Sequence, residues 1–220
     1  RFVQPPKIDL PDDLTELKKI YDAEPVGEFN NTMLRLEIVE KVAQSDNPGV
    51  LDLLAHIIDR DGHYDVNEAA VRELSAHGEL AVPVLIRMFK KGQSFYKTVA
   101  TEQLAQIKSA KAVPTLIEVA RNQALEIRIG SIRALGATAT VQDAQAPIIA
   151  AALVELMEDK ESLVRHATIE ALGQFPQKVG PHRQEVIASL RNHLNDPNAL
   201  VAKTARFTLR RKFRAPLKAP

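Results

Sequence analysis

Residues 163–175 read LVRHATIEALGQF, and residues 126–138 read EIRIGSIRALGAT. Both stretches place apolar side chains three and four positions apart, which is the pattern of an amphipathic helix. Related stretches recur along the chain, and each has an apolar anchor at the equivalent position. These anchors are Val42, Leu74, Leu104, Leu135, Leu172 and Leu209.

The anchors are 32, 30, 31, 37 and 37 residues apart. A repeat of this length holds one helical hairpin, and stacked hairpins bury a continuous core. A second apolar column, expected on the second helix of each hairpin, consists of Ile58, Phe89, Ala120, Met157 and Leu194. We therefore predict an all-α fold, a right-handed α-solenoid of about five helical hairpins with an extra helix at each end.

The two columns predict the positions of the helices. The first helices are expected at 31–43, 64–76, 94–107, 125–136, 161–174 and 198–213, and the second helices at 50–60, 81–91, 112–122, 146–158 and 184–195. A further helix at 12–23 would precede them. The six extra residues in each of the last two repeats are expected in loops at 137–146 and 176–184. The domain organisation would be an extended leader at 1–10, one solenoid domain at 11–213 and a basic tail at 214–220.

The segments VRHATIEALG, IRIGSIRALG, AVPVLI and AVPTLI resemble HEAT repeats, of the short type also found in phycobilisome chromophore lyases. The resemblance covers roughly residues 30–213. It implies a scaffold, adaptor or assembly factor. It also implies that the turn residue Asp159 is matched with Arg165, and that Asp196 has no basic partner in the next unit, where Ala202 stands.

Composition narrows the class of protein. Hydrophobic residues make up 45% of the 220, aromatic residues only 5%, and there is no cysteine. The absence of cysteine excludes disulfides and favours a reducing compartment, either the cytoplasm or an organelle matrix or stroma. No apolar run approaches the roughly 18 residues that span a membrane. The sequence leaves open what precedes Arg1.

Catalytic motifs are missing from the sequence. None of the six histidines is followed by glutamate, so no HExxH zinc site or His-Glu di-iron site is expected. No phosphate-binding glycine loop occurs either. We predict a protein that is not an enzyme, with no metal and no cofactor.

A basic column precedes four of the anchors by seven residues: Arg35, Lys97, Arg128 and Arg165. It could bind phosphate, or it could hydrogen-bond helix ends and turn carboxylates between repeats. We favour the structural interpretation.

The second helices carry the predicted partner-binding groove, on the face that is concave in HEAT proteins. Its residues are His56, Arg87, Lys90, Glu118, Arg121, Glu155, Glu158 and Asn192. Basic residues in the middle and acidic residues toward the C-terminus suit a protein or peptide of mixed charge, because a nucleic acid needs sustained positive charge. An ordinary solvated face is the alternative.

The chain has an acidic head and a basic end. Residues 1–62 hold thirteen acidic and seven basic residues, whereas the 24 residues from Pro197 onward hold seven basic residues and no acid. A possible polyanion site comprises Arg206, Arg210, Arg211, Lys212 and Arg214. The apolar residues Val201, Ala205, Leu209 and Phe213 at helical spacing favour a capping role instead.

These features predict a non-catalytic protein-binding scaffold or assembly factor whose partner is another protein or a large complex. One alternative is a chromophore-lyase-like subunit or chaperone that acts on a light-harvesting protein. The other is nucleic-acid binding through the basic C-terminal end. The sequence does not indicate whether the chain forms homo-oligomers.

Overall fold

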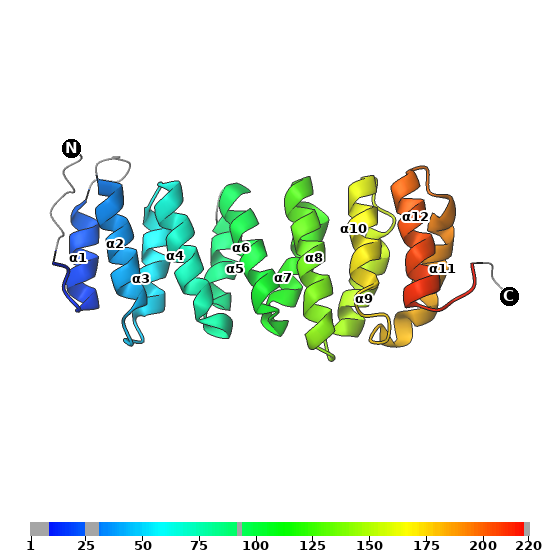
Figure 1. The fold of residues 1–220 in the computed structure, drawn as a ribbon, viewed down its shortest axis with the longest axis horizontal. Coiled ribbons are helices and arrows are strands. Elements are labelled where there is room, and N and C mark those ends of the chain that lie inside the picture. The colour runs from blue at the N-terminus through cyan, green and yellow to red at the C-terminus, as the bar shows by residue number, and fades with distance from the viewer. Residues whose placement is uncertain (1–8, 25–30, 92–93, 218–220) are drawn as a thin grey trace, which may run out of the picture. The chain divides into compact units, whose positions relative to one another are not determined.

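The computed structural model describes residues 9–24, 31–91 and 94–217 (Figure 1). The chain forms two compact units, residues 1–84 and 85–220. The α-helices of the first unit are α1 Leu14–Ala23, α2 Thr32–Ala43, α3 Val50–Arg60 and α4 Tyr64–Ala76. The division falls inside α5, Val82–Lys91. The second unit continues with α6 Ser94–Ile107, α7 Val113–Asn122, α8 Leu125–Val141, α9 Ala146–Leu156, α10 Ser162–Leu172, α11 Arg183–Asn192 and α12 Ala199–Phe207.

Within each unit the helices pair and stack as predicted. In the first unit, α4 packs against both α2 and α3. In the second unit, α8 packs against α6, α7 and α10, and α10 in turn packs against α12. No strand occurs in the described ranges. The predicted all-α architecture of stacked hairpins is confirmed, and the right-handed twist of the whole stack stays a prediction.

The anchor column forms the core. All six anchors are fully buried, at 0% exposure. In the second column, Ile58, Phe89, Ala120 and Met157 are buried, while Leu194 is half-buried because it lies near the end of the stack. The apolar periodicity of the sequence therefore identified the core correctly.

Local signals explain where the helices begin. Asp13 caps α1 and accepts hydrogen bonds from the backbone N of Thr15 and Glu16, both at 2.9 Å. This cap places the first turn two residues later than predicted from the sequence. Pro83, Pro114 and Pro147 lie in the first turns of α5, α7 and α9, where a missing N–H costs no helical hydrogen bond.

Helix α8 corrects one prediction. It continues through Val141, so the first half of the expected loop at 137–146 is helical. Thr138 and Ala139 are fully buried, and no breaker interrupts the segment, so burial carries the helix past Gly136. The second insertion, by contrast, forms a loop between α10 and α11, as predicted, and ends in a 3₁₀ turn at Gly180–His182.

The two insertions contact each other. Lys178 Nζ donates a 2.5 Å hydrogen bond to the Thr140 carbonyl and pairs with Asp143 at 2.6 Å. Phe175, just before the second insertion, and Val179 within it are 2% and 1% exposed. The extra residues of the two long repeats therefore pack into one local structure at the same edge.

The C-terminal end is closed by α12 and a π-helical turn at Thr208–Lys212. Val201, Ala205, Leu209 and Phe213 are buried against the last repeat, which confirms the predicted capping stripe. No helix in the described part of the chain is long and apolar enough to cross a membrane.

Candidate functional site

The basic column of the second unit connects successive repeats. Arg165, on α10, binds Asp196 through two parallel hydrogen bonds, Nε to Oδ2 at 2.8 Å and Nη2 to Oδ1 at 2.7 Å. Its Nη1 also donates to the carbonyl of Asp159 at 2.8 Å. One guanidinium thus holds the turns on both sides of its helix, in the bidentate geometry that arginine favours.

The preceding connection has the same form. Arg128, on α8, pairs with the Asp159 carboxylate, and its Nε donates to the Ala120 carbonyl at 2.9 Å. The other carboxylate oxygen of Asp159 accepts from the backbone N of Glu161 at 2.9 Å.

The family motif matched Asp159 with Arg165, and Arg165 does bind Asp159, but through the backbone carbonyl rather than the carboxylate. Each arginine binds the carboxylate of the turn that follows it, so Asp159 belongs to Arg128. Asp196 does have a basic partner, Arg165 of the unit before it. The register alone could not show which arginine binds Asp159, because this carboxylate lies between Arg128 and Arg165 of the column.

These contacts change the acidity of the carboxyls. The hydrogen bonds from Arg165 hold the pKa of Asp196 below its usual value, against burial, which raises it. Burial likewise raises the pKa of Asp159, but the hydrogen bond and charge of Arg128 outweigh it, and the net shift is downward. Both side chains are therefore held as structural anions.

In the first unit the column is buried more deeply. The side chains of Arg35 and Asp61 are each 1% exposed, with 3.5 Å between Arg35 Nη1 and Asp61 Oδ2. The Tyr21 hydroxyl, from α1, donates to the same carboxylate oxygen. Burial, followed by this hydrogen bond, raises the pKa of Tyr21. Asn67 stands where later repeats have a basic residue, and its amide donates to the Asp61 carbonyl at 2.5 Å.

The remaining member, Lys97, donates to Gln123 Oε1 at 3.2 Å. All four basic residues therefore hold helix ends and turns, which confirms the structural interpretation of the column.

The predicted groove residues of the second unit lie on its second helices and in the turn after α9. Seven of them are exposed: Arg87, Lys90, Glu118, Arg121, Glu155, Glu158 and Asn192. Arg121 Nη2 pairs with Glu155 Oε2 at 2.5 Å across two hairpins. Lys90 and Glu118 also line a small hollow of about 120 Å³ floored by Phe89 and Val119. The face thus combines mixed charge with a small depression.

His56 is the one predicted groove residue in the first unit. Its Nε2 lies 2.7 Å from Asp22 Oδ1, and its ring meets that of Tyr21 edge to face. The contacts of His56 are thus with α1.

The predicted polyanion residues Arg206, Arg210, Arg211, Lys212 and Arg214 are all exposed. The backbone beside them is held by α11, because Arg183 donates to the Phe213 carbonyl at 2.8 Å and Arg191 to the Pro216 carbonyl at 3.3 Å. The basic residues therefore project from a fixed turn rather than from a free strand.

Histidine and carboxylate clusters of metal-site size do not occur in the part of the chain that the structure describes. His193 is buried, with its ring nitrogens 2.8 Å from the Ser189 carbonyl and 2.7 Å from the Met157 carbonyl. Its contacts join α11 to the preceding hairpin.

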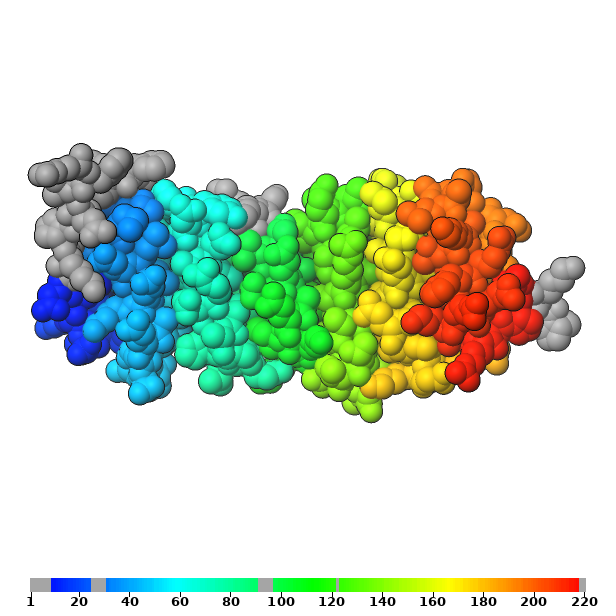
Figure 2. Space-filling model, viewed as in Figure 1, coloured from blue at the N-terminus to red at the C-terminus, as the bar shows by residue number. Residues whose placement is uncertain are grey.

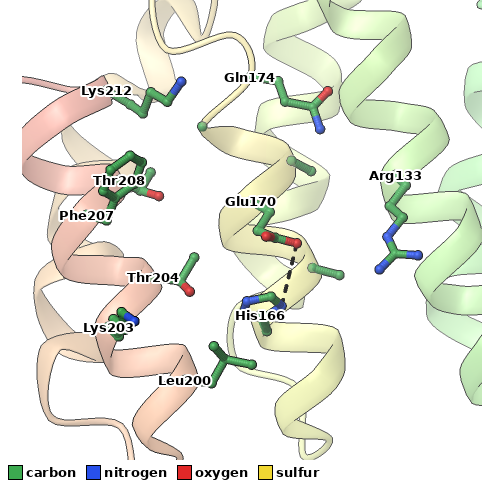
Figure 3. A pocket seen from close by; sticks show the side chains of 13 residues that line it. Arg133, His166, Glu170, Gln174, Leu200, Lys203, Thr204, Phe207, Thr208 and Lys212 are labelled. Atoms are coloured by element: carbon green, nitrogen blue, oxygen red, sulfur yellow. Dashed lines mark ion pairs between the residues drawn. The ribbon is translucent and has the colours of Figure 1, made fainter.

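One hollow in the second unit was not predicted. It is a groove of about 680 Å³ between α8, α10 and α12, on the face formed by the first helices (Figures 2 and 3). Leu200 and Phe207 line it, with 48% and 55% of their surfaces exposed. Their seven-residue spacing on the last helix was the available signal, since it places both on one face.

Comparisons with known proteins agree with this architecture. Neither a family model nor a curated protein matches the sequence. Among solved structures, a designed armadillo repeat protein in complex with the peptide (KR)4 has a TM-score of 0.58 and 17% identity, covering 90% of this chain and 99% of that one. A computationally designed armadillo repeat protein for modular peptide recognition has a TM-score of 0.55 and 15% identity, covering 90% and 98%.

A natural system is also similar. A structure from work on microtubule plus end tracking by XMAP215, CLIP-170 and EB1 has a TM-score of 0.56 and 17% identity, covering 92% of each chain. These likenesses show a helical repeat solenoid fold. They do not confirm the resemblance to chromophore lyases.

Proposed function

We propose that this chain is a non-catalytic protein-binding scaffold that holds an extended segment of a partner along the second helices of its second unit. The observation that carries the proposal is the ordered row of exposed charges on that face. Arg87 and Lys90 lie on α5, Glu118 and Arg121 on α7, and Glu155 on α9. None of these side chains serves the buried core.

The order of charges predicts the order of the partner. An acidic stretch would lie over α5 and a basic stretch over α7 to α9, where Glu118, Glu155 and Glu158 stand. The exposed pair of Arg121 with Glu155 is weak enough to open for a ligand, since such pairs contribute about 0–1 kcal/mol. The similar designed protein solved with the peptide (KR)4 supports the idea that stacked helices of this kind can accept a peptide.

The test uses a displayed library of short peptides, followed by affinity measurement on the peptides selected. Glu118→Lys with Glu155→Lys should weaken their binding at least about tenfold, because the charge that orders the partner is reversed. The matched control is Glu102→Lys with Glu126→Lys, two exposed reversals on the first helices. A native pull-down with mass spectrometry would then name the physiological partner.

Equal losses in the two double variants would mean that only net charge matters. Unchanged affinity in Glu118→Lys with Glu155→Lys would remove the second-helix face as the site. The thermal midpoint should stay within a few degrees in either case, because exposed charge changes cost about 0.5 kcal/mol or less.

The two alternatives remain separable from this proposal. A chromophore-lyase-like role would be indicated by a coloured chromophore that co-purifies with the chain. Nucleic-acid binding through the basic end would be indicated by binding to short RNA or DNA that depends steeply on salt.

A further inference from the structure

We infer that the groove between α8, α10 and α12 is a second interaction surface, one that binds an acidic peptide segment carrying a large apolar side chain. This surface lies on the first helices and is separate from the face of the proposed scaffold function. Figure 3 shows α10 as its floor, with α8 on one side and α12 on the other. The inference rests on the shape, the apolar surface and the unpaired charge of this groove.

The floor of the groove, on α10 and the turn after it, combines small side chains with the polar side chains of His166, Glu170 and Gln174. Ala167 and Ala171 face it from α10, and Gly173 follows at the end of that helix. Longer side chains stand on either side, Arg133 on α8 and Phe207 on α12. The small residues leave a hollow between the side chains of α8 and α12 that side chains of the unit itself do not fill.

One wall carries exposed apolar surface. Leu200 and Phe207, with Lys203 and Thr204 between them, occupy positions i, i+7, i+3 and i+4 of one helical face. The opposite face of α12 buries Val201 and Ala205 in the core, so the exposed apolar pair is not needed for capping. Exposed aromatic and aliphatic side chains beside a groove are typical anchors of protein interfaces.

The charge of the groove is positive. Arg133, Lys203 and Lys212 line it, and in the described ranges no carboxylate pairs with any of the three. The one acid among the lining residues, Glu170, lies 3.6 Å from the ring of His166. By contrast, the arginines of the basic column are held by turn carboxylates. The free cations of the groove are therefore available to an external acid.

These properties favour an acidic peptide over a polynucleotide. A phosphate backbone would meet Glu170 on the floor and would gain little from Leu200 and Phe207. A peptide can place carboxylates near Arg133 and Lys203 while one apolar side chain packs against Phe207. Complementary charge and an apolar anchor together give such a segment both orientation and affinity.

The experiment measures fluorescence anisotropy of a labelled acidic peptide of about 12 residues with one Phe and one Leu, at physiological salt. Phe207→Ala and Lys203→Glu should each raise the dissociation constant at least about tenfold. The matched control is Arg206→Glu, on the same helix but outside the groove, which should change it by less than about twofold at this ionic strength. Replacing the peptide acids by amides, or its Phe by Ala, should weaken binding as strongly.

Several results would overturn the inference. No binding up to about 1 mM peptide would do so, as would an equal loss in Arg206→Glu. If single-stranded RNA displaces the peptide in a way that depends on Lys203 but not on Phe207, the groove binds nucleic acid. If the chain self-associates and Phe207→Ala abolishes this, the groove binds a second copy of the chain. Glu118→Lys with Glu155→Lys should leave this binding unchanged, so its failure is separable from that of the scaffold proposal.

Discussion

The ion pair formed by the basic column differs between the two units in burial and in geometry. In the first unit, Arg35 and Asp61 are almost wholly buried, and Tyr21 donates a hydrogen bond to the same carboxylate. In the second, Arg165 and Asp196 are 12% and 3% exposed and meet through two parallel hydrogen bonds. A charged column in a repeat sequence therefore predicts contacts between repeats, but not their burial or geometry.

The largest expected loss of stability follows from breaking the buried pair of Arg35 and Asp61. Arg35→Ala should lower the free energy of unfolding of the first unit by about 3–5 kcal/mol, because it leaves the Asp61 carboxylate buried with no cation. Arg165→Ala should cost less, about 2–3 kcal/mol, because its guanidinium lies closer to water. Urea denaturation with amide exchange in α2 and α10 separates the two. A larger cost for Arg165→Ala would reverse the comparison.

The pH dependence of stability should also differ. The lowered pKa of Asp196 means that its contribution is present above the unfolded value, near 3.9, and is lost as the pH falls below it. The raised pKa of Tyr21 means the opposite: its contribution is present below about pH 10 and is lost as the pH rises further. Amide hydrogen exchange across both pH ranges measures these two parts of the pH dependence of stability, here called the acid arm and the alkaline arm.

Two substitutions assign these arms to their residues. Asp196→Asn should flatten the acid arm in α10 and α12, and Tyr21→Phe should flatten the alkaline arm in α1 and α2. An alkaline arm that persists in Tyr21→Phe would contradict the assignment.

A smaller effect, a gain in stability, is expected at the contact of the basic column where a glutamine stands in place of a carboxylate. Lys97 meets the neutral Gln123, so Lys97→Arg with Gln123→Asp should rebuild the charged contact seen at Asp159 and Asp196. We expect the free energy of unfolding to rise by about 0.5–1.5 kcal/mol, through one charge-assisted contact. Gln123→Asp alone is the control, and a lower thermal midpoint in the double variant would show that the site cannot hold the arginine.

The smallest effect is expected from cations outside the column. Replacement of Arg210, Arg211, Lys212 and Arg214 by glutamine should change the free energy of unfolding by no more than about 0.5 kcal/mol, since all four are exposed. Chemical denaturation checks this. A loss of about 2 kcal/mol or more would mean that the basic end stabilises the last repeat through its charge as well as through Leu209 and Phe213.

Most of the fold could be predicted from the sequence because the core is a set of periodic columns. The anchors and the capping stripe of α12 follow directly from apolar spacing, and the breakers mark most helix ends. The extension of α8 could not be predicted from spacing, because residues 137–141 contain neither a strong apolar stripe nor a breaker. Its helical state depends on burial of Thr138 and Ala139 by neighbouring repeats.

The candidate surfaces were less predictable. Exposure of Glu118 and Glu155 follows from helical phase, so a charged second-helix face could be predicted from the sequence. The groove between α8, α10 and α12 could not be predicted from the sequence. Its shape depends on the sizes of side chains that lie about 40 residues apart in the chain, from Ala167 to Phe207. The basic residues around Phe207 indicate a charged tail, whereas its seven-residue spacing from Leu200 carries the information about the groove.

The contact between the two insertions limits how this array can be rearranged. Lys178 of one long repeat holds the Thr140 carbonyl and Asp143 of the other. A chain shortened by one of these repeats would leave Phe175 and Val179, or the end of α8, facing water. A repeat protein engineered from this array would therefore have to carry the two long repeats together to keep this contact.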